Sequence, residues 1–273
     1  MELTNRDLRH RLVLKFDATL QLTKCAGFNT ATIDRLGVKS RTFQDYIVYD
    51  DTEPCPYLPG QTARMPLAIP SRPMTGDEAD RRFAAGQRRS GEFVYTTECP
   101  SCNACRPLRV DVGKFRPNSS QRKAWRRGVP LIRSAVAPLA NDQQHIELFN
   151  LHRQSRGLER ATPVDMESYS WGLGRSCFDA FEIDYFIEDR LMGVAICDRG
   201  RTSLSAVYTY YDPAFLKYSP GTYSILRQIE YCRENQMQFL YLGFFIAQSP
   251  HMAYKSNFRP HQRLCGGQWT EFE

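Results

Sequence analysis

The chain has 273 residues, of which 42% are hydrophobic and 24% charged, as in globular proteins with one large domain or two smaller ones. Charged residues such as Arg6, Asp7, Arg9 and Arg11 interrupt the apolar positions at the N-terminus, and no apolar run is long enough to cross a bilayer. Nine cysteines without an export signal indicate reduced thiols. We therefore expect a cytoplasmic protein rather than a secreted or membrane-spanning one. The net charge of +6 is modest, so its distribution is more informative than its total.

Residues 1–41 are weakly patterned and are predicted to form an N-terminal extension. Apolar side chains recur there at intervals of four, which favours a short amphipathic helix: Leu8, Leu12, Phe16 and Leu20. A strand is predicted over 42–48. The segment 50–60 is predicted to be a loop, because it combines three prolines, a glycine and an acidic cluster.

Four cysteines in two loops form a candidate metal site: Cys55, Cys99, Cys102 and Cys105. The last three recur at intervals of three residues, so their sulfurs can converge, and zinc ions and iron–sulfur units take four mainly sulfur ligands. Two prolines flank Cys55 and hold it extended in its loop. Strands are predicted at 92–97 and 106–112, on either side of this cysteine knuckle, and are expected to pair. The predicted metal is structural, and unliganded thiols remain the alternative that spacing leaves open.

A helix is predicted over 75–89, because Thr75 and Glu78 have the spacing of a capping box. Residues 87–91 are then expected to form a basic turn before the next strand.

The segment 114–133 is the most basic part of the chain. It contains no acidic residue and seven basic ones: Lys114, Arg116, Arg122, Lys123, Arg126, Arg127 and Arg133. Phe115 and Trp125 are interleaved with them, and Asn118 can cap a helix that begins near Gln121. Basic side chains with aromatic neighbours are typical of phosphate-backbone binding, so a nucleic-acid surface is predicted, and a solvated basic helix is the alternative.

The second half of the chain has a different pattern. Helices are predicted at 141–156, 165–176 and 221–235, and strands at 178–188, 190–198, 203–211 and 239–245. This order indicates an α+β or mixed α/β fold and is that of acyltransferases with the acetyltransferase-like fold. We expect three parts: the extension 1–41, a small cysteine-knuckle domain over 42–135 that includes the basic helix, and an acetyltransferase-like mixed-sheet domain of the GNAT or Fem type over 136–273.

Ordered blocks of sequence in both halves resemble the arginyl-tRNA–protein transferase family, and within it the bacterial aspartate/glutamate leucyltransferases. The blocks begin at Cys55, Gly86, Cys99, Phe115, Ser120, Leu204, Ser219, Tyr241 and Met252. The resemblance implies an enzyme that transfers an amino acid from aminoacyl-tRNA to the α-amine of proteins beginning with Asp or Glu, which marks them for degradation in the N-degron pathway. It also implies that the basic helix binds tRNA through Arg122, Lys123, Arg126 and Arg127.

The sequence departs from the family pattern at two places. Leu58 stands where the eukaryotic arginyltransferases have the second cysteine of a CxxC motif, and the three-cysteine knuckle is that of the bacterial branch. We therefore predict leucine as the transferred amino acid, with arginine as the alternative. Gln248 and Ser249 replace a Gly-Cys pair, which argues against a thiol nucleophile there.

The implied reaction is aminolysis of an activated ester, which requires positioning, a proton path and donors for an oxyanion but no cofactor. Candidate catalytic residues are Tyr208, Asp212, Tyr241 and Thr222. The acceptor's carboxylate calls for a cation, and candidate substrate-binding residues are Lys255, Arg259 and Tyr254. Turn formation, helix capping and surface charge are the structural alternatives for these residues.

Two other functional classes would account for parts of the sequence. An acetyltransferase that uses acetyl-CoA would need a glycine-rich pyrophosphate loop, which the sequence does not contain. A non-enzymatic zinc-knuckle RNA-binding protein would explain the cysteines and the basic helix, but it would assign no role to the second half.

Overall fold

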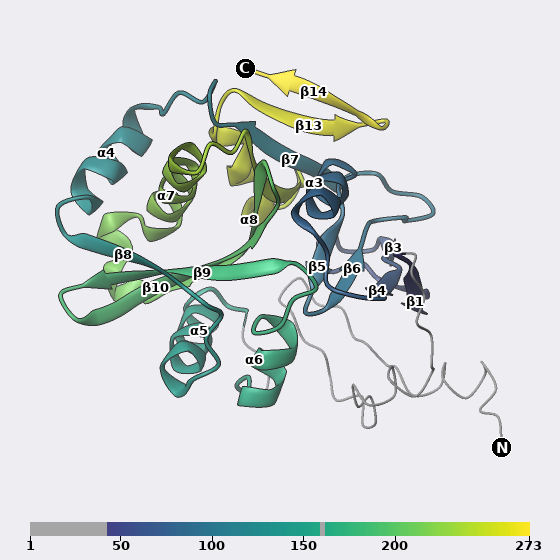
Figure 1. The fold of residues 1–273 in the computed structure, drawn as a ribbon, viewed down its shortest axis with the longest axis horizontal. Coiled ribbons are helices and arrows are strands. Elements are labelled where there is room, and N and C mark those ends of the chain that lie inside the picture. The colour runs from purple at the N-terminus through teal and green to yellow at the C-terminus, as the bar shows by residue number, and fades with distance from the viewer. Residues whose placement is uncertain (1–42, 159–161) are drawn as a thin grey trace.

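The computed structural model describes residues 43–158 and 162–273 (Figure 1). The N-terminal extension predicted over 1–41, with its candidate helix, lies outside the described residues. Within the described part of the chain, no helix is both long and apolar enough to cross a membrane.

A twisted eight-stranded sheet forms the centre of the fold (Figure 1). Its strands, in spatial order, are β14 (Gln268–Phe272), β13 (His261–Cys265), β7 (Arg106–Asp111), β12 (Phe239–Phe245), β11 (Ser203–Tyr211), β10 (Arg190–Arg199), β9 (Asp179–Ile187) and β8 (Ile132–Ala137). Neighbouring strands are antiparallel except β11 and β12, which run parallel. This mixed sheet with its helices confirms the predicted α+β fold class.

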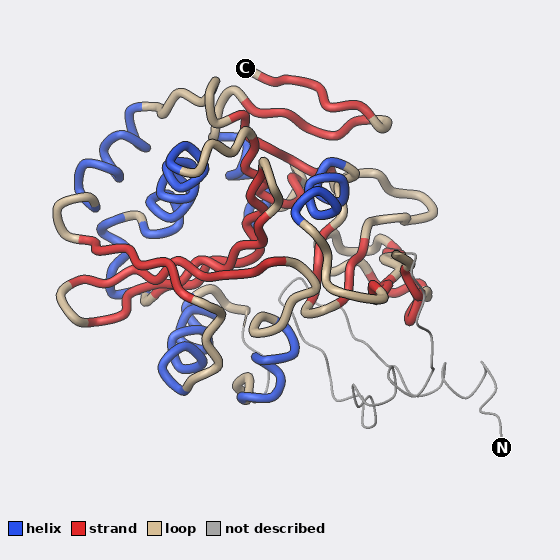
Figure 2. Tube along the Cα trace, in the orientation of Figure 1, coloured by secondary structure: helices blue, strands red, loops and turns tan. Residues whose placement is uncertain are grey.

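Helices cover both faces of the large sheet (Figure 2). One face carries α4 (Ser119–Gly128) and α7 (Pro220–Glu234), and the other carries α5 (Gln143–Ser155) and α6 (Met166–Gly172). The central strand β10 is buried along nearly its whole length, as expected for a strand covered on both sides. The two faces accordingly have separate apolar clusters, one against α7 and one against α5 and α6.

A smaller layer lies beside the large sheet. It contains a four-stranded sheet in the order β1 (Asp45–Tyr49), β4 (Leu67–Pro70), β6 (Phe93–Tyr95) and β5 (Arg88–Ser90), and the hairpin of β2 (Thr52–Pro54) and β3 (Thr62–Arg64). Helix α3 (Gly76–Ala84) packs Phe83 against Phe178 and Tyr241 of the other half. The predicted capping box of Thr75 and Glu78 is confirmed, with hydrogen bonds in both directions.

The expectation that the strands flanking the cysteine knuckle pair with each other is wrong. β6 pairs with β4 and β5, whereas β7 crosses into the large sheet between β12 and β13. The reason is burial, because Leu108 and Val110 of β7 are almost fully buried in the apolar cluster against α7. The knuckle therefore connects the two sheets instead of closing a hairpin.

The expected basic turn at 87–91 is also wrong, since Arg88–Ser90 forms strand β5. The hairpin β13–β14 and strand β8 were not predicted. Three short helices complete the fold: η1 (Pro213–Tyr218), α8 (Pro250–Ala253) and η2 (Tyr254–Asn257).

The division into domains at 135/136 stays a prediction. The large sheet takes strands from both sides of that position, and β8 spans it. The sheet thus joins the two halves of the chain into one layer.

Candidate active site

The parallel pair β11 and β12 separates in the middle of the large sheet. The two strands pair only between Ser203 and Ser205 on β11 and between Phe239 and Tyr241 on β12. Each strand then has a bulge, where its register shifts against its antiparallel neighbour. Bulges bend strands and interrupt ladders, so backbone groups beyond this point need other partners. We call this place, where the two strands diverge, the β11–β12 split.

Arg88 of β5 reaches into the β11–β12 split. Its Nη1 donates to Ser205 Oγ at 2.7 Å and its Nη2 donates to the Ala206 carbonyl at 2.6 Å. Gly243 of β12 lies on the other side, in the left-handed region at φ +82°. A Cβ at this glycine would lie 3.2 Å from the guanidinium carbon of Arg88. The glycine therefore allows both the bulge and the close approach of the cation.

The neighbouring arginine has a different role. Arg89 Nε lies 2.8 and 2.9 Å from the two carboxylate oxygens of Asp198, and both side chains are almost fully buried. Successive strand residues point to opposite faces, so Arg88 and Arg89 diverge from the same short strand. Arg89 thus forms a structural ion pair, while the Arg88 guanidinium contacts only neutral oxygens through the hydrogen bonds described for it.

Lys255 supplies a second cation at the split. It is 8% exposed, and its Nζ donates to the Phe244 carbonyl of β12 at 2.8 Å. Burial and the nearby Arg88 lower the pKa of Lys255 to about 7. An amine with this pKa is partly neutral at neutral pH and can accept a proton. The split therefore combines a fixed cation for an anionic group with a group suited to proton transfer.

Tyr208 lies on β11 just past its bulge. It packs against Phe149 and His152 of α5 with ring centroids 5.6 and 6.4 Å away. Burial raises the pKa of Tyr208 to about 12, so its hydroxyl stays protonated at neutral pH. Such a hydroxyl can donate a hydrogen bond to an oxyanion but is a poor base. Tyr254 is 46% exposed, and the charge of its hydroxyl adds to the rise in the pKa of Tyr208.

The other predicted catalytic residues have structural contacts. Asp212 is 3% exposed, accepts from the backbone N–H of Ala214 at 2.8 Å and pairs with Arg190. Tyr241 is buried next to Trp269, and its hydroxyl accepts from Arg109 Nη1 at 3.0 Å. These contacts match the structural alternatives, and the catalytic roles of both residues stay predictions.

Thr222 lies in the first turn of α7. Ser219 precedes this helix with φ +55° and makes no side-chain capping bond, so no capping side chain covers the helix start. A free helix N-terminus attracts anions through its N–H groups. Arg259 is exposed, and its Nε donates to the Ser256 carbonyl at 3.0 Å.

The predicted basic helix is α4, and Asn118 caps it as expected. Arg122, Lys123, Arg126 and Arg127 are all exposed, and the helix contains no acidic residue. Trp125 points inward and stacks on Tyr223 of α7 with centroids 5.4 Å apart. Arg127 donates to the Lys217 carbonyl of η1, which places the basic surface beside the start of α7.

The structure brings Cys55 to the knuckle cysteines. Burial raises the pKa of Cys105 to about 12, and the charges of Cys55, Cys99 and Cys102 add to this rise. All four thiols are half-buried, so their number and chemistry fit a metal or cluster. In the described part of the chain no three of these sulfurs lie within 4.8 Å of one another, whereas thiolates on one zinc ion are about 3.8 Å apart.

Comparison with known proteins shows the same blocks that the sequence suggested. Residues 53–123 match the N-terminal model and residues 144–265 the C-terminal model of arginine-tRNA-protein transferase. An aspartate/glutamate leucyltransferase from Chromobacterium violaceum is 40% identical over 217 residues, which are 79% of this chain and 89% of the relative. The chain belongs to the arginine-tRNA-protein transferase family. The family resemblance predicted from the sequence is therefore confirmed.

Other relatives carry the same description. The aspartate/glutamate leucyltransferase of Thiobacillus denitrificans is 37% identical over 223 residues, covering 80% of this chain and 91% of the relative. That of Acinetobacter baumannii is 36% identical over 216 residues, covering 79% and 80%. Among solved structures, FemX aligns with 93% of this chain and 92% of its own at 10% identity and a TM-score of 0.45. This TM-score is too low to support a structural inference, so the fold class is assigned from the sheet topology alone.

Sequence reasoning missed Arg88 as a site residue. It lies in the Gly86–Gly91 block of the family, but two adjacent arginines between glycines also suit a basic turn. The signal that could have found it is the short β-strand, because alternation points the two arginines in opposite directions, Arg89 toward Asp198 of β10 and Arg88 toward the β11–β12 split.

Proposed function

We propose that this protein transfers leucine from leucyl-tRNA to the α-amine of proteins that begin with Asp or Glu. The observation that carries the proposal is the 40% identity with the Chromobacterium violaceum aspartate/glutamate leucyltransferase along 89% of that relative. The geometry agrees, because a buried cation, a proton acceptor and an exposed basic helix are all present. We further propose that the reaction takes place in the cytoplasm, where aminoacyl-tRNA is available, and that the product enters N-degron protein degradation.

The reaction replaces an ester bond with an amide bond. The acceptor's α-amine attacks the carbonyl carbon of the leucyl ester, a C–N bond forms, and the C–O bond to the tRNA ribose breaks. The acceptor ammonium must first lose a proton, and the departing ribose oxygen must gain one. A tetrahedral oxyanion forms between these steps and needs hydrogen-bond donors.

We assign these tasks to residues at the β11–β12 split. Arg88 binds the acceptor's side-chain carboxylate, since its guanidinium carries a charge that Ser205 and Ala206 do not neutralise. The neutral form of Lys255 takes the proton from the acceptor ammonium. Tyr208 donates its hydroxyl to the oxyanion.

We assign the remaining predicted residues to tRNA binding, acceptor binding and structure. The start of α7 at Thr222 suits the terminal phosphates of the tRNA, and α4 binds its backbone through the four exposed basic residues. We keep Tyr254 as a wall of the acceptor site, because it is exposed beside Tyr208. The cysteines Cys55, Cys99, Cys102 and Cys105 are proposed to hold a structural zinc ion or iron–sulfur unit, with no part in the transfer.

The decisive experiment is a transfer assay with the purified protein. Labelled leucine or arginine, its synthetase and bulk tRNA are incubated with peptides that begin with Asp, Glu, Asn or Gln. We expect leucine to be joined to the Asp and Glu peptides only, since Asn and Gln lack the charge that Arg88 binds. Transfer of arginine alone would replace the proposed donor, and transfer of neither amino acid would refute the enzyme.

A further inference from the structure

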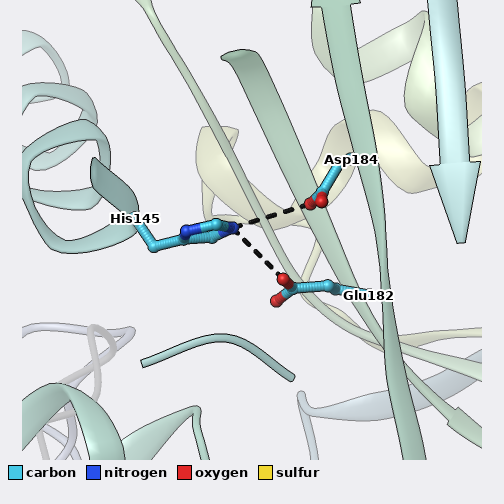
Figure 3. A group of neighbouring side chains, drawn as sticks. All are labelled: His145, Glu182 and Asp184. Atoms are coloured by element: carbon cyan, nitrogen blue, oxygen red, sulfur yellow. Dashed lines mark ion pairs between the residues drawn. The ribbon is translucent and has the colours of Figure 1, made fainter. Parts of the chain in front are cut away.

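His145, Glu182 and Asp184 form a buried cluster that is separate from the four-cysteine candidate metal site (Figure 3). His145 belongs to α5, and the two carboxylates point from β9 toward it. His145 Nε2 lies 3.1 Å from Glu182 Oε1 and 3.7 Å from Asp184 Oδ1. Their side chains are 7%, 1% and 11% exposed.

The cross-strand neighbours of the two carboxylates on β10 are apolar, while the hydrogen-bonded hydroxyls of Tyr169 and Tyr210 lie near both acids. Glu182 lies opposite Ile196 of β10, and Asp184 lies opposite Val194. On this face of the sheet these neighbours belong to the apolar cluster under α5 and α6. In the described part of the chain, His145 is the basic residue with which either carboxylate forms an ion pair. Two buried acids therefore face a single imidazole.

The tautomer of His145 follows from Asp142, the residue that caps α5. Asp142 Oδ1 accepts the backbone N–H of His145 at 3.0 Å and lies 2.8 Å from its Nδ1. A carboxylate oxygen can only accept, so Nδ1 carries a proton. Nε2, on the other side of the ring, is the atom that faces Glu182 and Asp184. Metal-ligating histidines usually donate the N–H of one ring nitrogen to a carboxylate or carbonyl and bind the metal through the other nitrogen. His145 has this arrangement, with Asp142 at Nδ1 and with Nε2 directed at the two buried carboxylates.

A proton on Nε2 does not complete this cluster. Nε2, both oxygens of Glu182 and Oδ1 of Asp184 are buried. Although Nε2 lies 3.1 Å from Glu182 Oε1, none of these atoms makes a well-oriented hydrogen bond within the described part of the chain. An imidazolium would also leave one of the two carboxylates uncompensated in an apolar layer, which is unfavourable. A neutral imidazole would place its lone pair against two negative groups. A divalent cation cancels both carboxylate charges and gives each of these atoms a partner.

We propose that His145 Nε2, Glu182 and Asp184 bind a first-row divalent metal ion, with Zn²⁺ as the leading candidate. The three ligand atoms lie within 4.8 Å of one another. Ligands about 2.0–2.2 Å from one tetrahedral zinc ion are roughly 3.3–3.6 Å apart, close to the observed separations. One nitrogen and two oxygens suit Zn²⁺ and its first-row neighbours better than softer ions.

The metal holds α5 to β9. The same helix carries Phe149 and His152, which pack against Tyr208. The ion therefore fixes the wall behind one of the proposed catalytic residues without touching the substrate. Its role is structural and is independent of the four knuckle-site cysteines, which lie in the loop after β2 and between β6 and β7.

The test uses full-length protein that has been stripped of metal and then titrated with Zn²⁺ against a chromophoric chelator. Wild-type protein is expected to bind one more Zn²⁺ per chain than Glu182→Gln, a change that keeps the shape of the side chain but removes its charge. Zn²⁺ is also expected to raise the melting temperature of the wild type more than that of the variant, because it binds the folded state. Glu147→Gln, the same change at an exposed carboxylate on the same helix, serves as the matched control and is expected to behave as wild type.

Co²⁺ separates this site from the cysteines. Cobalt bound by thiolates has intense charge-transfer absorption, whereas cobalt bound by nitrogen and oxygen shows only weak bands. The weak bands should appear in wild type and vanish in Glu182→Gln. Should Glu182→Gln fail to fold, Asp142→Asn tests the same site, with an expected loss of affinity of about 10- to 100-fold. Equal zinc stoichiometry and affinity in wild type and variant, or cobalt spectra of the thiolate type alone, would overturn the proposal and leave a buried ionic cluster.

Discussion

Adjacent arginines on β5 show how burial and partner choice decide the role of one residue type. Arg89 Nε lies within hydrogen-bonding distance of both carboxylate oxygens of Asp198, and this partner compensates the buried charge of Arg89. Arg88 donates to the hydroxyl of Ser205 and the carbonyl of Ala206, which satisfy its N–H groups but not its charge. Arg89 is therefore expected to contribute to stability, and Arg88 is expected to bind an anion.

Replacing Arg88 with Ala should lower kcat/KM for an Asp-initiated peptide by about tenfold to hundredfold, because a hydrogen bond to a charged group contributes about 1.5–3 kcal/mol. The same variant should treat an Asn-initiated peptide as poorly as wild type does, so discrimination between the two peptides falls. Steady-state kinetics with both peptides measure this. A parallel loss for both peptides would instead indicate a damaged fold.

Lys255 illustrates how burial changes the chemistry of an amine. Its pKa of about 7 in the folded protein compares with about 10.4 for an unfolded chain. Between these values the unfolded state binds more protons than the folded state, so the free energy of unfolding rises with pH. Below about pH 7 both states are protonated and this dependence ends.

Lys255→Met should remove that dependence. From pH 7 to pH 9, the free energy of unfolding of wild type should rise by about 2 kcal/mol relative to the variant. Denaturant unfolding of both proteins across this range measures the difference. Parallel curves would show that Lys255 keeps an ordinary pKa and would remove it as the proton acceptor.

At the scale of elements, the buried face of α4 fixes the position of the helix, and its exposed basic face is proposed to bind tRNA. Gln121, Ala124 and Gly128 are buried, and Gly128 lies so close to Tyr223 that a Cβ there would come within 2.4 Å of the ring. The basic side chains are consequently held outward on a rigid helix.

Replacing Arg126 and Arg127 with Ala should weaken tRNA binding and reduce its salt dependence. Each lost phosphate contact lowers the slope of log K against log salt by about one. Filter binding at several salt concentrations measures both effects. Arg81→Ala, an exposed basic position on α3, is the control and should leave the slope unchanged. Unaltered tRNA binding by the double variant would show that α4 is a solvated basic helix without a role in tRNA binding.

At the scale of the whole molecule, the four cysteines of the candidate metal site come from two loops that are far apart in sequence. Cys55 follows β2, while Cys99, Cys102 and Cys105 lie between the small sheet and the large one. A metal or cluster there would link the two layers through residues far apart in sequence.

Cys55→Ser should lower both the metal content and the melting temperature. Protein purified without air is expected to carry one zinc ion or one iron–sulfur unit at this site, and the variant should lose it. Elemental analysis for zinc and iron, with sulfide determination, measures the content. Cys232→Ser, at a buried thiol on α7, controls for the loss of a cysteine as such. Wild type and Cys55→Ser with the same metal content would exclude the four-cysteine site.

Local sequence determined the parts of this protein that depend on neighbouring residues. The caps at Thr75 and Asn118, the strands at 203–211 and 239–245 and the family blocks follow from short-range patterns. Only the tertiary structure decided that β7 joins the large sheet, that Arg88 enters the β11–β12 split, and that His145 meets Glu182 and Asp184. These contacts join residues dozens of positions apart, and they depend on sheet order and on which face each strand buries. The periodicity of the sequence does not specify the order of strands in a sheet or the face that each strand buries. The sequence therefore indicated the type of chemistry, whereas only the tertiary structure showed which residues come into contact.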